Sequence, residues 1–156
     1  MGDVMPETNS LNMNKRTSGV WNISLGDWDP SLETGMELVD SQHQAMFAQI
    51  RVLLDHSQTG RVPGTLEFMA VYAVEHFGME ERLHEETAYP FAEEHLDTHN
   101  RFIAAFKELR QEYDVSGHSL VILIKLASFL LDWWKEHIRN RDQQFADYFH
   151  RLRLPT

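Results

Sequence analysis

Two pairs of potential metal ligands lie close together near the middle of the chain. His76 and Glu80 form the first pair and His95 and His99 the second, and the members of each pair are four positions apart. On an α-helix this spacing turns through roughly 400°, so both side chains leave the same face about one turn apart. Pro90, which would end a helix, lies between the pairs. The spacing therefore predicts two neighbouring helices that present ligands to one another.

Three further candidate ligands lie in the flanking segments. His43 stands among apolar residues at helical spacing, and His137 is followed five residues later by Asp142. Five residues of a regular α-helix rotate through roughly 500°, which would place these last two side chains about 140° apart. If both face one cluster, we expect the helix to be locally unwound between them, for example as a π-bulge, which often marks a functional site.

The available donor atoms limit the chemistry. The chain has nine histidines and no cysteine, which excludes disulfides and thiolate-bound zinc or iron–sulfur sites. Imidazole nitrogen and carboxylate oxygen suit iron, zinc, copper or manganese. A single histidine on an apolar face is usually a core residue, but five in one core would be costly unless a metal accepted their lone pairs. The candidate ligands are His43, His76, Glu80, His95, His99, His137 and Asp142.

Seven ligands exceed the needs of one tetrahedral zinc ion and predict two six-coordinate ions that share bridging carboxylates. A ferritin-like carboxylate site would need two Glu-x-x-His repeats, and only Glu81 to His84 has that form. A structural zinc bundle is the weakest alternative.

The elements that would position these ligands are four helices. Apolar residues recur at three- and four-residue steps from 31 to about 59, from 65 to 86, from 91 to 113 and from 119 to 150, the last with a break. Gly60, Pro63, Pro90 and Gly117 separate them. The short connections predict an all-α fold, an up-down-up-down antiparallel four-helix bundle over residues 21–156. Residues 1–20 are polar and predict a flexible, extended N-terminal arm, and residues 20–30 predict an extended segment over a bundle end.

Composition narrows the classes of partner. At 156 residues, 42% hydrophobic and 24% charged, the chain suits one domain with a substantial core. A net charge of −10 argues against nucleic acid and anionic membrane as partners. No apolar run approaches the ~18 residues of a membrane helix, and no secretory leader pattern is present, so we expect a cytoplasmic protein.

The motifs together resemble the hemerythrins, specifically the bacterial hemerythrin-like group, over residues 28–148. The matching positions are Trp28, Gly35-Met-Glu-Leu-Val-Asp40-Ser-Gln-His43, His76-Phe-x-x-Glu80-Glu81, Tyr89-Pro90, His95-x-x-x-His99 and His137-Ile138-x-x-x-Asp142. The resemblance implies a non-haem di-iron centre with an oxo or hydroxo bridge. It implies one iron on His95, His99 and His137 and the other on His43 and His76. Glu80 and Asp142 would bridge, and dioxygen would bind at the two-histidine iron.

The function that the resemblance implies is reversible dioxygen binding for storage, delivery or sensing, without catalysis. A redox partner or a small-molecule reductant is a further expected partner. The rival interpretation is a di-iron redox enzyme acting on peroxide, nitric oxide or iron, which would need an open polar route and a proton donor. A second rival is an interaction module whose metal centre reports redox state.

Several other side chains carry separate expectations. Trp134 stands where relatives more often have Leu and could narrow the ligand pocket, and His84 stands where Met is common. We expect His84 to lie at the surface or to hydrogen-bond a ligand. We expect solvated positions for His56, His118 and His150, and a pocket wall made of Phe47, Phe77, Phe102, Trp134 and Ile138.

Overall fold

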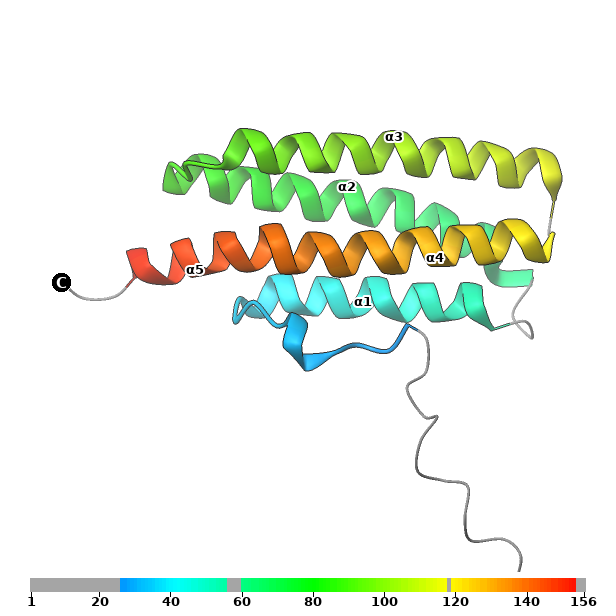
Figure 1. Cartoon of the computed structure of the whole chain (residues 1–156), viewed down its shortest axis with the longest axis horizontal. Coiled ribbons are helices and arrows are strands. Elements are labelled where there is room, and N and C mark those ends of the chain that lie inside the picture. The colour runs from blue at the N-terminus through cyan, green and yellow to red at the C-terminus, as the bar shows by residue number, and fades with distance from the viewer. Residues whose placement is uncertain (1–25, 56–59, 118, 154–156) are drawn as a thin grey trace, which may run out of the picture.

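The computed structural model describes residues 26–55, 60–117 and 119–153, and in these ranges the regular structure is helical throughout. The elements are η1 (Pro30–Leu32), α1 (Glu37–Leu54), α2 (Val62–Thr87), α3 (Ala92–Ser116), α4 (Leu120–His137), the π-helical turn η3 (Ile138–Asp142) and α5 (Gln143–Leu152). The helices α4 and α5 continue one another through η3 as a single rod (Figure 1).

Four rods lie side by side and alternate in direction (Figure 1). Contacts join α1 to α2, α2 to α3, α3 to α4 and α4 back to α1, so each rod packs against two neighbours. This is the predicted all-α, up-down-up-down bundle. None of the described helices is long and apolar enough to cross a membrane.

The turn between α2 and α3 sets those two helices antiparallel. Helix α2 ends at Thr87, and the next residue, Ala88, has a left-handed φ of 51° and donates its N–H to the carbonyl of Glu85. The N–H of Tyr89 reaches back to the carbonyl of His84 at 2.9 Å, which satisfies another carbonyl at the helix end. Because α3 begins only four residues after Ala88, the ligand faces of the two helices lie opposite each other.

The predicted first helix begins later than expected, at Glu37 instead of near residue 31. Asp29 accepts the N–H of Ser31 and caps the short η1 turn. Asp40 then accepts hydrogen bonds from the N–H groups of Thr34 and Gly35, at 2.8 and 3.0 Å. These side-chain acceptors hold residues 33–36 as a loop, so the helical periodicity overestimated the length of α1.

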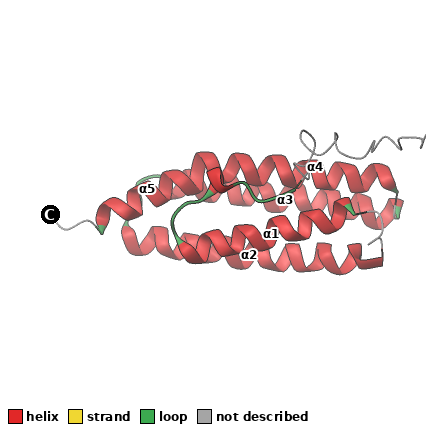
Figure 2. Ribbon diagram, turned by 90° about the horizontal axis from the view of Figure 1, so that it is seen from below, coloured by secondary structure: helices red, strands yellow, loops and turns green. Residues whose placement is uncertain are grey.

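The segment before η1 lies along α1, which corrects the expectation that it covers a bundle end (Figures 1 and 2). The ring of Trp28 packs edge-on against Phe47 with centroids 5.5 Å apart, and it lies 6.2 Å from the ring of His43. Asp27 pairs with Arg51 at 3.0 Å on the same helix. Residues 20–25 of the predicted segment, and the predicted arm over residues 1–20, lie outside the described residues.

A single apolar cluster fills the bundle. It is dominated by α4, whose Leu123, Leu126 and Leu130 are at most 4% exposed and pack with residues of the other three rods. Burial of this kind stabilises by about 25 cal/mol per Å² of apolar surface, so packing against neighbours accounts for most helix stability.

Candidate metal centre

Seven of the buried polar side chains gather at one place in this apolar core. They come from all four rods, each is at most 4% exposed, and they are the seven candidate ligands His43, His76, Glu80, His95, His99, His137 and Asp142. Their donor atoms fall into two groups, each with all atoms within 4.8 Å of one another: Glu80 with His95, His99 and His137, and Glu80 with His43, His76 and Asp142. The structure thus brings together every predicted ligand.

The first group is centred on His137. Its Nε2 lies 3.0 Å from Nε2 of His95 and 3.1 Å from Nε2 of His99. Oδ1 of Asp142 lies 3.0 Å from Nε2 of His137 and 3.1 Å from Nε2 of His95. Three imidazole nitrogens therefore converge here with one oxygen from Asp142 and one from Glu80.

The second group has two imidazoles. Nε2 of His43 lies 3.2 Å from Nε2 of His76 and 3.1 Å from Oδ2 of Asp142. The two oxygens of Asp142 thus face different groups. Oε2 of Glu80 lies 3.6 Å from Nε2 of both His76 and His95, and so stands between the groups as well.

The π-helical turn places Asp142 in reach of the histidines. Gln143 donates its N–H to the carbonyl of Ile138, five residues earlier, instead of to the residue four earlier. The wider turn offsets the rotation that a regular α-helix would impose between His137 and Asp142. The predicted local unwinding is therefore confirmed.

The outward nitrogens of two imidazoles meet acceptors. Nδ1 of His76 lies 2.8 Å from Oε1 of Gln42, and Nδ1 of His99 lies 3.0 Å from Oε1 of Glu81. An amide or carboxylate oxygen only accepts, so each Nδ1 carries the hydrogen and donates it. The lone pair of each ring is then on Nε2, which points into the cluster. Neither acceptor was predicted in this role.

The same tautomer follows for His137 by a different route. The hydroxyl of Thr98 donates its hydrogen to the carbonyl of His95 at 2.6 Å. Its oxygen is then left to accept the Nδ1–H of His137, which lies 3.2 Å away. Such outward hydrogen bonds orient metal-bound histidines and raise their basicity. The position of Thr98 beside His99 was the only available sequence signal for this role.

The inward nitrogens fit a metal ion. Burial lowers the pKa of His76, His99 and His137, so all three rings are neutral. Nε2 of His99 and Nε2 of His137 therefore direct lone pairs at each other across 3.1 Å, which is repulsive. A cation between them would turn that repulsion into coordination, and histidine nitrogens with carboxylate oxygens suit iron.

The two buried carboxylates have pKa values shifted in opposite directions. Burial, together with the negative charge of Asp142, raises the pKa of Glu80 well above its usual value. Burial would also raise the pKa of Asp142, but the imidazoles of His137, His43 and His95 hold it well below its usual range. Keeping both carboxylates ionised beside neutral imidazoles whose lone pairs face inward therefore requires positive charge in the cavity.

Aromatic rings surround the cluster. Phe77 stacks on His99 with centroids 4.0 Å apart, and Trp134 lies 5.8 Å from His43 and 5.5 Å from His76. All five predicted wall residues are buried, and of these Phe77 and Trp134 lie directly against imidazoles. Trp133 stacks on His137 at 4.3 Å, a contact that was not predicted.

The expectation that His84 lies at the surface is wrong, and its alternative, a hydrogen bond to a ligand, is not made directly. Its side chain is 2% exposed, and neither ring nitrogen has a hydrogen-bond partner among the described residues. It lies eight residues after His76, just over two turns, so it shares the buried face. His150 is exposed as predicted and contacts the carbonyl of Thr34, whereas His56 and His118 fall outside the described residues.

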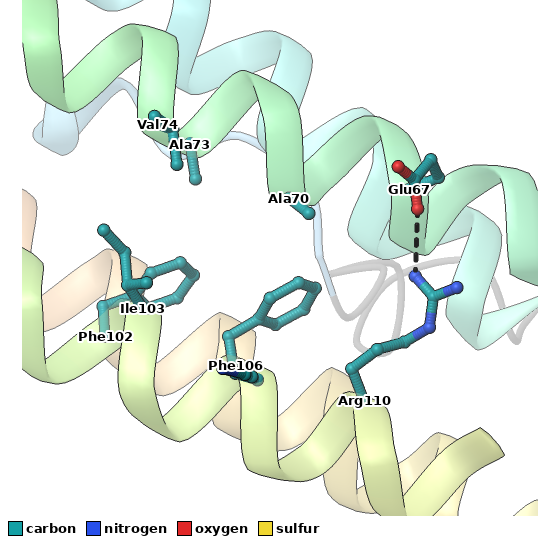
Figure 3. Close-up of a pocket in the computed structure, with 9 residues that line it drawn as sticks. Glu67, Ala70, Ala73, Val74, Phe102, Ile103, Phe106 and Arg110 are labelled. Atoms are coloured by element: carbon teal, nitrogen blue, oxygen red, sulfur yellow. Dashed lines mark ion pairs between the residues drawn. The ribbon is translucent and has the colours of Figure 1, made fainter.

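An apolar pocket of about 320 Å³ opens between α2 and α3 (Figure 3). Its lining comprises Glu67, Ala70, Ala73, Val74, Phe102, Ile103, Phe106, Lys107 and Arg110, with a Glu67–Arg110 ion pair at one end. Phe102 in its wall meets Phe77 edge-on with centroids 5.6 Å apart. Because Phe77 stacks on His99, two aromatic rings separate this pocket from the cluster.

Comparison with known proteins places these features in a family. The model of the hemerythrin HHE cation binding domain matches residues 34–149, which include all seven candidate ligands. The chain is 31% identical over 123 residues to a bacteriohemerythrin of Stenotrophomonas maltophilia, covering 77% of this chain and 78% of the relative. It is 30% identical over 124 residues to a bacteriohemerythrin of Pseudomonas aeruginosa (strain PAO1), with the same coverage.

A more distant similarity extends to an animal protein. The chain is 26% identical over 118 residues to a myohemerythrin of Riftia pachyptila, covering 76% of this chain and 88% of the relative. The family match spans the whole ligand-bearing bundle from the loop before α1 to α5. The chain therefore belongs to the hemerythrin family.

Proposed function

We propose that this protein binds dioxygen reversibly at a non-haem di-iron centre, for storage, delivery or local sensing. The observation that carries the proposal is the pair of buried imidazole groups that share Glu80 and Asp142, with neutral nitrogens directed at one another. The bacteriohemerythrin and myohemerythrin relatives support iron as the metal.

The geometry favours an unequal division of the ligands. His95, His99 and His137 would hold one iron, His43 and His76 the other, and Glu80 and Asp142 would bridge. The two-histidine side has one nitrogen fewer, which would leave room for dioxygen. Iron held by these residues would supply the two electrons that reversible dioxygen binding requires.

The side chains around the cluster would favour reversible dioxygen binding. Trp134, which is 1% exposed, lies beside both His43 and His76 and keeps water from that side of the cluster. Phe77 covers the other side through its stack on His99. Excluding water limits the escape of reduced dioxygen as a charged species, and so limits irreversible oxidation of the metal pair. A protein or small-molecule reductant would restore any oxidised centre.

The test is a visible absorption spectrum of the anaerobically reduced, iron-loaded protein before and after exposure to dioxygen, with an iron count. We expect two irons per chain and an absorption band that appears with dioxygen and disappears when dioxygen is removed. Oxidation with continuous consumption of a reductant, without a band that reverses, would instead support the di-iron enzyme. A chain that takes up no iron would overturn both.

A further inference from the structure

Two of the five metal-facing histidines, His43 and His95, have no outward hydrogen-bond partner among the described residues, whereas the other three do. Nδ1 of His95 is buried and has no partner among the described residues, although its Nε2 lies within the first ligand group. The corresponding nitrogens of His76, His99 and His137 contact Gln42, Glu81 and Thr98. Buried polar atoms are rarely left unpaired, so this nitrogen calls for an explanation.

The ring of His84 lies next to His95, with ring centres 4.6 Å apart, and neither ring nitrogen of His84 has a partner among the described residues. The ring of Tyr89 lies against His84 in turn, with ring centres 5.0 Å apart, and its buried hydroxyl likewise has no partner in the described part of the chain. Phe145 closes the far side, with ring centres 4.3 Å from His84 and 5.0 Å from Tyr89.

The three groups have complementary hydrogen-bonding roles. With Nε2 turned to the metal, His95 has an Nδ1–H to donate. Burial raises the pKa of Tyr89 to about 12, so its phenol keeps its hydrogen and can donate it too. A neutral imidazole such as that of His84 has one ring nitrogen that only accepts. A buried water typically makes about three hydrogen bonds to groups of this kind.

We propose that His84, Tyr89 and His95 enclose a binding site for one water molecule, which accepts the Nδ1–H of His95. The water also accepts from Tyr89 and donates to His84, so one molecule satisfies three buried groups. His84 is then a positioning residue: it holds the water that orients His95 toward the metal. The inference rests on the proposed function in that His95 binds a metal ion.

A high-resolution crystal structure of the full chain tests the water directly, with or without metal, and so does not depend on dioxygen binding. We expect an ordered water within hydrogen-bonding distance of His95 Nδ1, a nitrogen of His84 and the hydroxyl of Tyr89. The same structure of His84→Met, which keeps the volume and removes the nitrogens, should lack that water. Electron density that shows no water at this place in the unsubstituted chain would overturn the proposal.

Metal retention tests the positioning role. Outer hydrogen-bond partners of metal ligands typically change metal affinity 10–100-fold, so we expect His84→Met to lose zinc or iron to a chelator at least ~10-fold faster. His84→Gln, which can still accept a hydrogen bond, should recover much of that loss. Tyr89→Phe should speed metal loss, and combining it with His84→Met should add little, because both act through one water.

Phe145→Leu is the matched control, because it changes packing against the same rings without removing a hydrogen-bonding group. It should retain metal better than His84→Met. Equal losses in these two variants, or fully additive losses for His84→Met with Tyr89→Phe, would show that His84 only fills space. If that result is obtained and the absorption band still appears and disappears with dioxygen, the proposal on His84 fails while the proposed function stands.

Discussion

At the scale of single residues, the centre depends on which ring nitrogen of each histidine carries the hydrogen. A neutral imidazole has one donor and one acceptor nitrogen, and its outward partner decides which is which. Gln42 and Glu81 settle this for His76 and His99 because their oxygens only accept. None of these partners is itself a candidate ligand, yet they direct the lone pairs inward.

Replacing Thr98 by Val should weaken metal binding while leaving every candidate ligand in place. The change removes the oxygen that accepts the Nδ1–H of His137, so we expect metal affinity to fall by ~10-fold or more. Competition with a chelator measures it. Thr87→Val is the control, since the hydroxyl of Thr87 donates to the carbonyl of Leu83 away from the cluster. Similar affinities in the two variants would contradict the role of Thr98.

Trp134→Phe should speed dioxygen release without loss of metal. The indole N–H is buried beside His43 and His76 and has no partner among the described residues, so it is free to donate to a bound ligand. Phe keeps the apolar ring and removes the donor. A net hydrogen bond contributes about 1 kcal/mol, which corresponds to a several-fold change in the rate measured by stopped flow. An unchanged rate would restrict Trp134 to excluding water.

At the scale of the elements, much of the arrangement could be predicted because its signals are local. Helical periodicity located the four rods, and the five-residue interval from His137 to Asp142 predicted the unwinding seen in η3. The start of α1 could not be predicted, because it depends on Asp40 accepting hydrogen bonds from a loop five and six residues away. The path of Trp28 along α1 is likewise a tertiary packing choice.

The pocket between α2 and α3 provides an element-scale test. Ala70→Leu should partly fill it, and because dioxygen is apolar we expect slower dioxygen association if this side is its approach to Phe102 and Phe77. Flash photolysis or stopped flow would give the rate, and a drop of several fold is expected. Val71→Leu is the control, since Val71 is 52% exposed and does not line the pocket. Equal rates in both variants would mean that dioxygen reaches the cluster from elsewhere.

At the scale of the whole molecule, ligands from all four rods make metal binding and folding one process. An unfolded chain cannot offer this site, so the binding free energy of the metal adds to the stability of the bundle. Without metal, burial lowers the pKa of His76, His99 and His137 and so disfavours their charged form.

Acid should therefore destabilise the metal-free bundle. Burial lowers the pKa of His84 from its usual 6.5 to about 4, and it also lowers the pKa of His76, His99 and His137. Below pH 6.5 the unfolded chain binds protons that the folded chain does not, so the free energy of unfolding falls as the pH is lowered toward 4. Urea titrations across this range measure it. His84→Met should flatten the slope; an unchanged slope would exclude a contribution from His84.

The position of Asp142 between the two ligand groups has a consequence for how the protein takes up its two metal ions. The two oxygens of Asp142 face separate groups and Glu80 lies between those groups. Because the pKa of Glu80 is raised, a first ion would draw Glu80 into its ionised form and so favour binding of an ion by the other group. Loading should then be cooperative. Native mass spectrometry during an iron(II) titration should show chains with zero or two ions and few with one. A dominant singly loaded species at half-saturation would indicate that the two positions act independently.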